Sequence, residues 1–501
     1  MNPSLKSFFR QRIPLICFLV GYLLFAAFKH KDYGITWDEY IVYMGGYWLY
    51  QDITGHPQAI LRDDSVAPGS PHYDHLYPLG LYILNQKLTI PGFHLSNMVF
   101  AGSILAVGYE SVLPFCVNPW LALAGPAFLV LNPRFFGEWS NNPKDMPFAV
   151  FYFLSLCLIY HWRRSEKWGP LLILGLVMGA ATCVRLLGLS LIAVYALSEI
   201  YEQFRDINLK KVLISVIWRT GFLLGVVLLV LLATWPFLRE SPLFHGIRLL
   251  QLTADFPWNM PVLFNGQEIP GTELGLSYLP NWFLISTPLF ILALALAGVW
   301  FFLKKNESSF GIFLVLVLIF HGLVYLALKP NVYDGVRHYL FLEPILSILA
   351  CLVFINTVQS AWGWKWAVII LVSVNALLVG WNMVVLHPFE YTYFNEAVGG
   401  LSGAAWKFET EYTGASYKEA VEWIESHEAL DPRKIYHINT EGSAFQSAHY
   451  FLPNMEWTYL KDADYFIVNT RWNKQAQVDP SKVIHVVERE GVPFTYVFKL
   501  R

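Results

Sequence analysis

Acidic and basic side chains gather in three short segments that separate apolar stretches of this 501-residue chain. The first is Thr36-Trp37-Asp38-Glu39, about ten residues after the first apolar stretch. The second runs from Asn132 to Pro147 and carries Arg134, Glu138, Lys144 and Asp145, and the third runs from Lys329 to Tyr339 and carries Asp334, Arg337 and His338. A further cation, Arg185, lies between two apolar stretches, where a charge at membrane depth costs enough free energy to indicate a role.

Carboxylates beside cations suit a reaction that moves a proton and releases an anion. An acidic side chain takes a proton from an acceptor hydroxyl, while the positive groups stabilise a leaving phosphate. A sugar joined to a lipid phosphate supplies such a leaving group. A free Asp has a pKa near 4, so it becomes an effective base when a pocket at the bilayer boundary partly desolvates it.

Simpler interpretations exist for each of these residues taken alone. Asp38 and Glu39 are solvated in that case, or they cap a helix that the sequence predicts over residues 40–50. The basic residues then anchor lipid headgroups with their long side chains. Three loops of mixed charge on one face favour the functional interpretation.

Composition identifies the chain as a membrane protein. Hydrophobic residues make up 55% of it and charged residues 14%, against about 25% charged in ordinary soluble domains. Stretches long enough to cross a hydrocarbon core recur along most of the chain. Eleven transmembrane helices are predicted at about 13–28, 96–116, 119–133, 146–161, 169–184, 187–203, 212–236, 282–303, 309–328, 339–357 and 366–386.

The positions of Lys and Arg predict the orientation, because positive residues in short loops stay on the cytoplasmic side. With the N-terminus inside, eleven crossings also place inside the basic residues Arg163, Arg164, Lys167, Arg205, Lys210, Lys211, Lys304, Lys305 and Lys365. The loops at about 29–95, 134–145, 237–281 and 329–338 then lie outside, together with everything after residue 387. The three charged segments thus share the outer face.

The composition changes after Leu386, and a second domain is predicted at 387–501, following a membrane domain at 1–386. Its sequence predicts a helix over 416–424 and strands over 434–439, 464–469, 483–487 and 494–500, which indicates a small α/β domain. The five cysteines contain no CxxC pair and fall in or beside apolar stretches, so neither disulfides nor a cysteine metal site is expected. The net charge of −2 gives no basic field for nucleic acid.

Thr36-Trp37-Asp38-Glu39 and Asn142-Pro143-Lys144-Asp145-Met146-Pro147 together resemble the GT-C superfamily of polyprenyl-phosphate-sugar glycosyltransferases. The branch most similar is that of protein O-mannosyltransferases and the lipid A aminoarabinose transferase. The segments Tyr333-Asp334-Gly335-Val336-Arg337-His338 and His387-Pro388-Phe389-Glu390-Tyr391-Thr392-Tyr393-Phe394-Asn395-Glu396 add to the resemblance, which covers most of the chain.

The resemblance implies an inverting sugar transfer from a polyprenyl phosphate carrier to an acceptor glycan, lipid or protein, on the outer face of a bacterial inner membrane. Asp38 then acts as base, Glu39 is its companion, and Asp145 is the second acidic residue of the site. Charge and motif together make Arg134, Lys144, Arg185, Arg337 and His338 the candidates for binding the donor phosphate. The need for a divalent metal stays open.

The main alternative is a polytopic transporter or lipid flippase, followed by a membrane assembly factor without catalysis. Transporters place ionisable residues near the bilayer midplane and often contain inverted repeats. Here the charged residues cluster in predicted outer loops, and the sequence contains no evident repeat. An enzyme is therefore the favoured interpretation.

Overall fold

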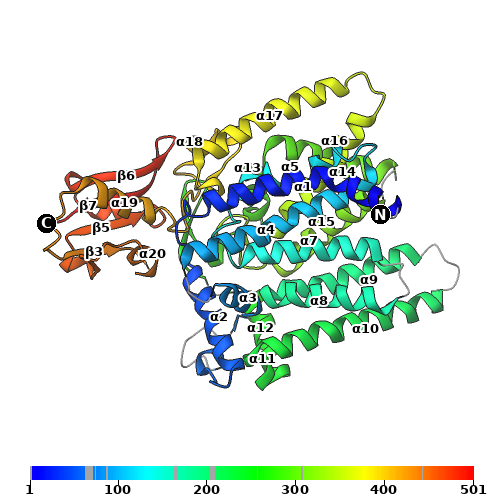
Figure 1. Ribbon diagram of the computed structural model, residues 1–501, viewed down its shortest axis with the longest axis horizontal. Coiled ribbons are helices and arrows are strands. Elements are labelled where there is room, and N and C mark those ends of the chain that lie inside the picture. Colours follow the sequence, from blue (N-terminus) through cyan, green and yellow to red (C-terminus); the bar gives the residue numbers. More distant parts are fainter. Residues whose placement is uncertain are drawn as a thin grey trace.

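The chain folds into a bundle of long helices with a small sheet domain at one end and the N-terminus at the other (Figure 1). The computed structural model describes residues 3–62, 72–73, 75–85, 89–162, 167–203, 209–254, 256, 258–305, 309–442 and 444–501. Arg163, Arg164 and Arg205, which entered the orientation argument, lie outside these residues.

Every predicted apolar stretch coincides with helix. The bundle comprises α1 (Pro3–Lys29), α4 (Ile90–Val112), α5 (Ala124–Val130), α7 (Asp145–Trp162), α8 (Trp168–Val184), α9 (Ser190–Gln203), α10 (Leu209–Thr234), α13 (Tyr278–Ser286), α14 (Leu289–Lys305), α15 (Ser309–Leu328), α16 (Glu343–Gln359) and α17 (Lys365–Leu386). Among the described residues, seven of these helices are long and apolar enough to cross a membrane, and α13 with α14 makes an eighth span bent by 119°. The remaining three predicted spans, those of α5, α8 and α9, are shorter apolar helices.

The short helices α8 and α9 meet at a break that positions a charge. Helix α8 ends at Val184 because Arg185 adopts an extended backbone with φ −146° and ψ 129°. A 3₁₀ turn over Leu186–Leu189 then leads into α9. Because of this break, Arg185 lies between two helices and not within one. It lies at the end of the bundle that carries the other predicted site residues.

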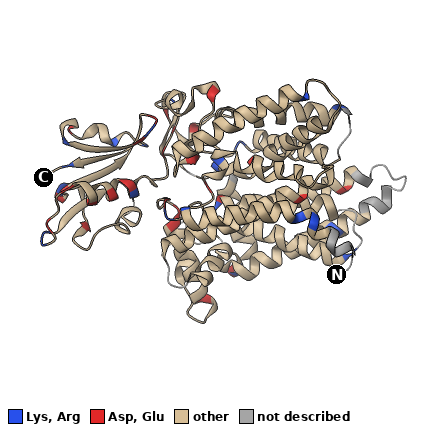
Figure 2. Cartoon of the chain, turned by 45° about the horizontal axis from the view of Figure 1, so that its top comes forward, with Lys and Arg blue, Asp and Glu red and all other residues tan. Residues whose placement is uncertain are grey.

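The loops predicted to lie outside fold into compact elements at the bundle end nearest the sheet domain (Figure 1). They form α2 (Glu39–Ile53), α3 (Leu76–Leu84), α6 (Pro133–Phe136), α11 (Pro236–Glu240), α12 (Pro242–Ala254) and an antiparallel pair, β1 (Pro261–Phe264) and β2 (Gln267–Pro270). Helix α2 matches the helix predicted over 40–50, whereas the β1–β2 hairpin and α12 were not predicted. Charged residues are sparse along the long helices and more frequent where the bundle meets the sheet domain (Figure 2).

The C-terminal sheet domain, defined as residues 417–501, has five strands in the order β4-β3-β5-β7-β6. Its elements are α19 (Tyr417–His427), β3 (Tyr436–Thr440), α20 (Phe445–Ala448), β4 (Met455–Trp457), β5 (Tyr465–Asn469), β6 (Val483–Arg489) and β7 (Val492–Lys499). Strand β3 runs parallel to β4 and β5, while β7 is antiparallel to β5 and β6. The predicted helix and four strands are confirmed. The three-residue β4 is too short to show as a pattern in the sequence.

A connecting segment, residues 387–416, packs between the bundle and the sheet domain and includes α18 (Gly400–Ala404). The amide of Asn395 donates to the carbonyls of Leu284 at 2.7 Å and Thr287 at 2.9 Å, where α13 bends into α14. Because these contacts satisfy carbonyls freed by the bend, the segment is fixed to the bundle rather than being a loose linker.

The arrangement yields a prediction about sidedness. Reporter fusions at Trp168 and Lys304 are expected to lie on the cytoplasmic side, and fusions at Asp145, Arg337 and after His387 on the opposite side, because the two groups lie at opposite ends of the bundle. Accessibility of single introduced cysteines to an impermeant thiol reagent provides a second measurement. A cytoplasmic C-terminus would contradict the predicted orientation.

Candidate active site at the end of the helix bundle

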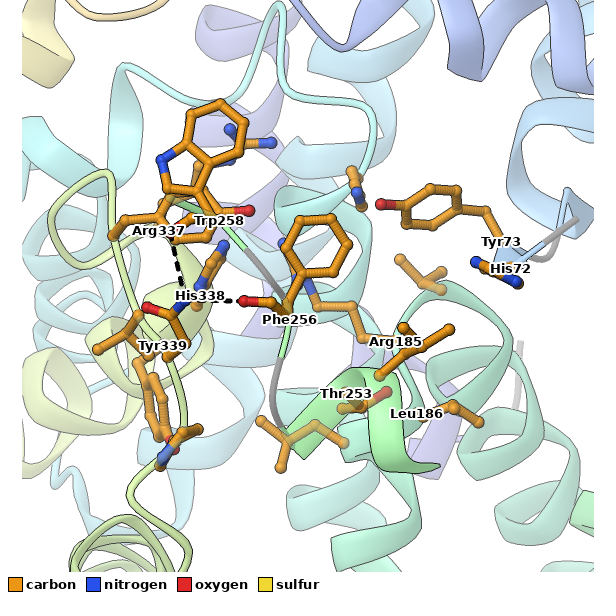
Figure 3. Close-up of a pocket in the computed structure, with 18 of the residues that line it drawn as sticks. His72, Tyr73, Arg185, Leu186, Thr253, Phe256, Trp258, Arg337, His338 and Tyr339 are labelled. Carbon is orange, nitrogen blue, oxygen red and sulfur yellow. Dashed lines mark hydrogen bonds between the residues drawn. The ribbon is translucent and has the colours of Figure 1, made fainter. Parts of the chain in front are cut away.

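A cavity of about 590 Å³ opens where the bundle meets the sheet domain (Figure 3). One wall is apolar and comes from the 3₁₀ turn after α8, from α12 and from α15: Leu186, Leu187, Leu189, Leu249, Leu250, Leu252, Val324 and Leu328. The lining also carries six charged residues, which we call the charged wall: Asp38, Lys144, Arg185, Asp334, Arg337 and Arg471. The cavity is therefore amphipathic, with the size and lining of a site for a ligand that is part apolar and part anionic.

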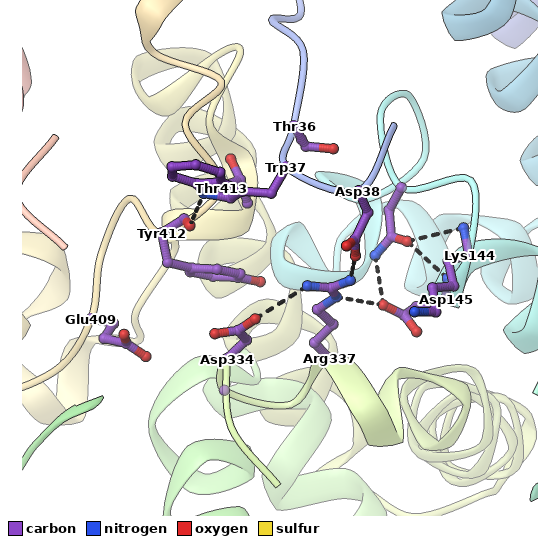
Figure 4. A network of polar contacts seen from close by, with 12 residues as sticks. Thr36, Trp37, Asp38, Lys144, Asp145, Asp334, Arg337, Glu409, Tyr412 and Thr413 are labelled. Carbon is purple, nitrogen blue, oxygen red and sulfur yellow. Dashed lines mark hydrogen bonds and ion pairs between the residues drawn. The ribbon is translucent and has the colours of Figure 1, made fainter. Parts of the chain in front are cut away.

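Arg337 is the centre of the charged wall (Figure 4). It lies in the 3₁₀ turn Arg337–Leu342 before α16, and its guanidinium forms ion pairs with three carboxylates. The partners are Asp38, Asp145 at 2.6 Å and Asp334 at 3.1 Å. A guanidinium has five donors in a planar fork, so it serves several oxygens at once and also suits phosphate.

Asp145 joins this arginine to the next. Its fully buried carboxylate also accepts hydrogen bonds from Arg185 and from the amide of Asn142 at 3.1 Å. Asp145 is the first residue of α7, where the helix dipole favours a negative charge, and the Asn142 Oδ1 accepts from its backbone N–H at 2.8 Å. Asp145 itself does not line the cavity but fixes two guanidiniums that do.

Asp38 faces the cavity from the residue before α2. Its carboxylate is 31% exposed and forms the ion pair with Arg337. The adjacent backbone N–H of Trp37 donates to the carbonyl of Thr413 at 3.1 Å, which ties the turn to the connecting segment. Asp38 is thus a partly exposed carboxylate at the cavity, on a turn whose backbone is hydrogen-bonded in place.

Glu39 lies apart from the cavity although it adjoins Asp38 in sequence. Its buried carboxylate accepts hydrogen bonds from the backbone N–H of Thr36 at 2.7 Å and from the hydroxyl of Tyr43 at 2.7 Å. One oxygen also contacts Nε2 of the buried His94 on α4 at 2.8 Å. Glu39 therefore fastens the start of α2 to the bundle, and its oxygens are occupied.

Lys144 extends the positive wall toward Tyr73. Its Nζ lies 3.9 Å from the centre of the Tyr73 ring, and this positive charge lowers the pKa of the Tyr73 hydroxyl. Within the described part of the chain, Lys144 has no carboxylate within ion-pair distance, unlike Arg185 and Arg337. Among the described residues, its charge is therefore in contact with an aromatic ring and not with a carboxylate.

His338 and Arg134, the other two predicted phosphate ligands, differ in position. His338 lines the cavity, with its ring edge-on to Tyr333 at 4.6 Å between centres. Arg134 is buried away from the cavity, where it lies over the Trp282 ring at 4.7 Å and donates to the carbonyl of Tyr391. The structure thus brings Asp38, Lys144, Asp145, Arg185, Arg337 and His338 together and leaves Glu39 and Arg134 outside this group.

Several residues at the cavity were not singled out from the sequence. Asp334 pairs with Arg337, and Arg471 of the sheet domain pairs with Asp334 and lies 3.6 Å from Glu409. Trp472 lies beside Trp37 with ring centres 5.7 Å apart. Asp334 lies in the third charged segment with Arg337 and His338, so its position in the sequence could have identified it as a site residue. Arg471 carries no such signal, because it lies far from the other charged segments in sequence.

Glu138 is a buried carboxyl group beneath Asp38. It accepts a hydrogen bond from the Asn142 amide at 2.8 Å and from the Tyr412 hydroxyl at 3.2 Å. Burial raises the pKa of Glu138 from its ordinary 4.5 to about 7, against the lowering effect of the Asn142 hydrogen bond. The native protein therefore holds this proton more tightly than the unfolded chain does.

A pH dependence of stability follows from Glu138. Its stabilising contribution is complete below about pH 4.5 and is lost as the pH rises through about 7, because the buried carboxylate must then ionise. The melting temperature of the parent protein in detergent is expected to fall between about pH 5 and pH 7, and Glu138→Gln to reduce that fall. Equal slopes for parent and variant would contradict the assignment.

A metal centre was left open by the sequence. Within the part of the chain that the structure describes, no three His, Cys, Asp or Glu side chains group closely enough to hold a metal ion. The carboxylates around the cavity are instead paired with arginines.

Comparison with protein-family models and with curated proteins gives no match for this chain. Among solved structures it is similar to ArnT from Cupriavidus metallidurans in the apo state, with a TM-score of 0.52 and 11% identity over 96% of this chain and 97% of that one. ArnT bound to undecaprenyl phosphate gives a TM-score of 0.48 and 13% identity over 96% and 98% of the two chains. AglB from Archaeoglobus fulgidus, in complex with an inhibitory peptide and a dolichol-phosphate, gives 0.48 and 10% over 90% and 69%. The likeness to apo ArnT shows that the two chains share a fold, as the resemblance led us to expect, and this chain is a polytopic helical membrane protein with a C-terminal α/β sheet domain.

Proposed function

We propose that this protein is a membrane glycosyltransferase that moves a sugar from a polyprenyl-phosphate donor to an acceptor hydroxyl on the extracytoplasmic face. The observation that carries the proposal is the amphipathic cavity, whose lining combines leucine side chains with charged ones, four of them Lys or Arg. A polyprenyl phosphate has the same division between an isoprenoid chain and an anionic head. The GT-C fold agrees with this activity.

The residues of the charged wall account for the chemistry. The acceptor oxygen attacks the anomeric carbon as its proton passes to Asp38, and the bond between that carbon and the phosphate oxygen breaks on the opposite side. The electron pair stays on the phosphate, where Arg337, Arg185, Lys144 and His338 stabilise it. A single displacement of this kind inverts the configuration at the anomeric carbon.

Two of the predicted catalytic residues act through others in this mechanism. Asp145 orients Arg185 and Arg337, since it accepts hydrogen bonds from both. Glu39 holds the turn that carries Asp38, through its contacts with Thr36 and His94. We therefore assign both as positioning residues.

The proposal is tested by transfer of radiolabelled sugar from undecaprenyl-phosphate-linked donors to acceptors extracted from the cell envelope, with and without EDTA. The purified parent protein is expected to transfer one sugar in a manner that Asp38→Asn abolishes. Mass spectrometry of envelope glycans from a deletion strain identifies the sugar and the acceptor. Movement of the lipid across vesicles without any transfer would instead favour the flippase alternative.

Lys144 gives a more specific test of phosphate binding. Lys144→Met is expected to raise the donor KM by about 10- to 100-fold with a smaller effect on kcat, because a hydrogen bond from a charged donor contributes about 1.5–3 kcal/mol. Folding is expected to be preserved, since no described carboxylate loses its ion-pair partner. Lys499→Met, which removes a cation from the sheet domain that pairs with Glu428, is the control. An unchanged donor KM in Lys144→Met would exclude Lys144 from the phosphate site.

A further inference from the structure

Arg471, which follows β5, brings a charge of the sheet domain into the lining of the cavity. The Arg471 side chain is 4% exposed, and its guanidinium pairs with Asp334, in the loop between α15 and α16 of the bundle. It also lies between the rings of Trp258, Tyr412 and Trp472 at 5.1–5.8 Å from their centres. An arginine so enclosed is fixed in place, and it cannot itself move toward a ligand without breaking these contacts.

Two routes lead from Arg471 to Asp38. The first is a chain of alternating charges, in which Arg471 pairs with Asp334, Asp334 with Arg337, and Arg337 with Asp38. Arg471 also lies 3.6 Å from Glu409, so it compensates two buried acids. Burial raises the pKa of Asp334, and the charge of Arg471 opposes this effect. Without Arg471, therefore, Asp334 has Arg337 as its remaining cationic partner among the described residues.

The second route is through the backbone of Tyr412, whose contact with Trp37 is drawn in Figure 4. The carbonyl of Tyr412 accepts a hydrogen bond from Arg471 at 2.9 Å and another from the indole of Trp37 at 2.7 Å. Trp37 directly precedes Asp38, and its ring fills the space where a Cβ on Gly442 of the sheet domain would lie. Arg471 thus holds in place the Tyr412 carbonyl, which in turn binds the Trp37 side chain next to Asp38.

Resting on the proposed function, we propose that Arg471 of the sheet domain is a positioning residue of the active site, which holds Arg337 toward the donor phosphate and Asp38 toward the acceptor. The sheet domain is then part of the catalytic apparatus and not an appended module. Loss of Arg471 frees Asp334 to draw Arg337 away from the cavity and loosens the Trp37–Asp38 turn. Displacements of about 1 Å at a reacting group lower rates by up to about 10²-fold.

The experiment compares Arg471→Met with Arg489→Met in the full-length protein. Arg489 is also in the sheet domain. It contacts the connecting segment through the carbonyl of His387 at 3.2 Å, but it lies outside the cavity lining. Binding of undecaprenyl phosphate in detergent micelles and turnover in the transfer assay are measured for both, alongside melting temperatures. We expect Arg471→Met to lose about 10- to 100-fold in both activities and Arg489→Met to lose neither.

Further variants separate positioning from mere docking of the domain. Arg471→Lys retains the charge and is expected to recover part of the loss. Because Arg471 acts through Asp334, the double variant Arg471→Met with Asp334→Asn is expected to bind the phosphate no worse than Arg471→Met alone. Additive losses, or equal losses in Arg471→Met and Arg489→Met, would overturn the inference. Failure of the parent protein to bind undecaprenyl phosphate would instead overturn the proposed function.

Discussion

Asp38→Asn is expected to lower turnover by about 10²–10⁴-fold, the usual contribution of a general base. Asparagine keeps the size of the side chain and one oxygen for Arg337, but it accepts no proton. Because the carboxylate is 31% exposed at a cavity wall, the substitution leaves the packed core untouched and folding intact. The measurement is the rate of labelled sugar transfer by protein that is monodisperse in detergent.

Two controls make the Asp38 result specific. Asp52→Asn, near the end of α2, removes a carboxylate paired with Arg62 away from the cavity and is expected to retain parental turnover. Glu39→Gln is expected to lower turnover less than Asp38→Asn, since the amide preserves part of the contact set around His94 and Thr36. Near-parental turnover by Asp38→Asn would exclude it as the base, and an inactive Glu39→Gln in the same assay would point to its neighbour.

Arg337→Ala is expected to raise the donor KM by about 10- to 100-fold, because the guanidinium supplies charge-assisted hydrogen bonds worth about 1.5–3 kcal/mol. The substitution also leaves Asp38, Asp145 and Asp334 with one cationic partner fewer. Breaking a buried ion pair lowers the free energy of unfolding by about 3–5 kcal/mol. Arg337→Lys keeps the charge and serves as the variant that folds. Binding of undecaprenyl phosphate and thermal unfolding together report the two effects.

The control for Arg337 is Arg12→Ala, which breaks a bidentate pair with Glu110 at 2.7 Å near the N-terminus, at the other end of the bundle. That variant is expected to bind undecaprenyl phosphate as the parent does. If Arg337→Lys kept the donor KM and kcat of the parent, the phosphate role would pass to Arg185 or Lys144.

The fold was largely predictable because bilayer thickness sets a simple rule for apolar segments. The rule found the helical segments, and the gap that it left between the stretches at 169–184 and 187–203 coincides with the break at Arg185. It missed α12 and the β1–β2 hairpin, since short elements in a polar loop are stabilised by contacts that the local sequence does not reveal.

The site residues were predictable where charged side chains stood in short loops between apolar stretches. Arg337, Asp145 and Lys144 stood out in this way, and the structure brings them together. Glu39 adjoins Asp38 in sequence but lies apart from the cavity, because consecutive residues at the start of a helix point about 100° apart, so one carboxylate faces the cavity and the next faces the bundle. Arg134 carries the same charge as Arg337, but Trp282 and Tyr391, distant in sequence, hold it elsewhere.

The pairing of Arg337 and Arg185 with Asp38, Asp145 and Asp334 makes ligand binding an exchange of anions. Under the proposed function, a donor phosphate therefore competes with these carboxylates for the guanidiniums. Because the charges of the resting site compensate one another, it projects a weak field and attracts charged lipid little from a distance. The same competition would favour release of the carrier once the sugar has been transferred.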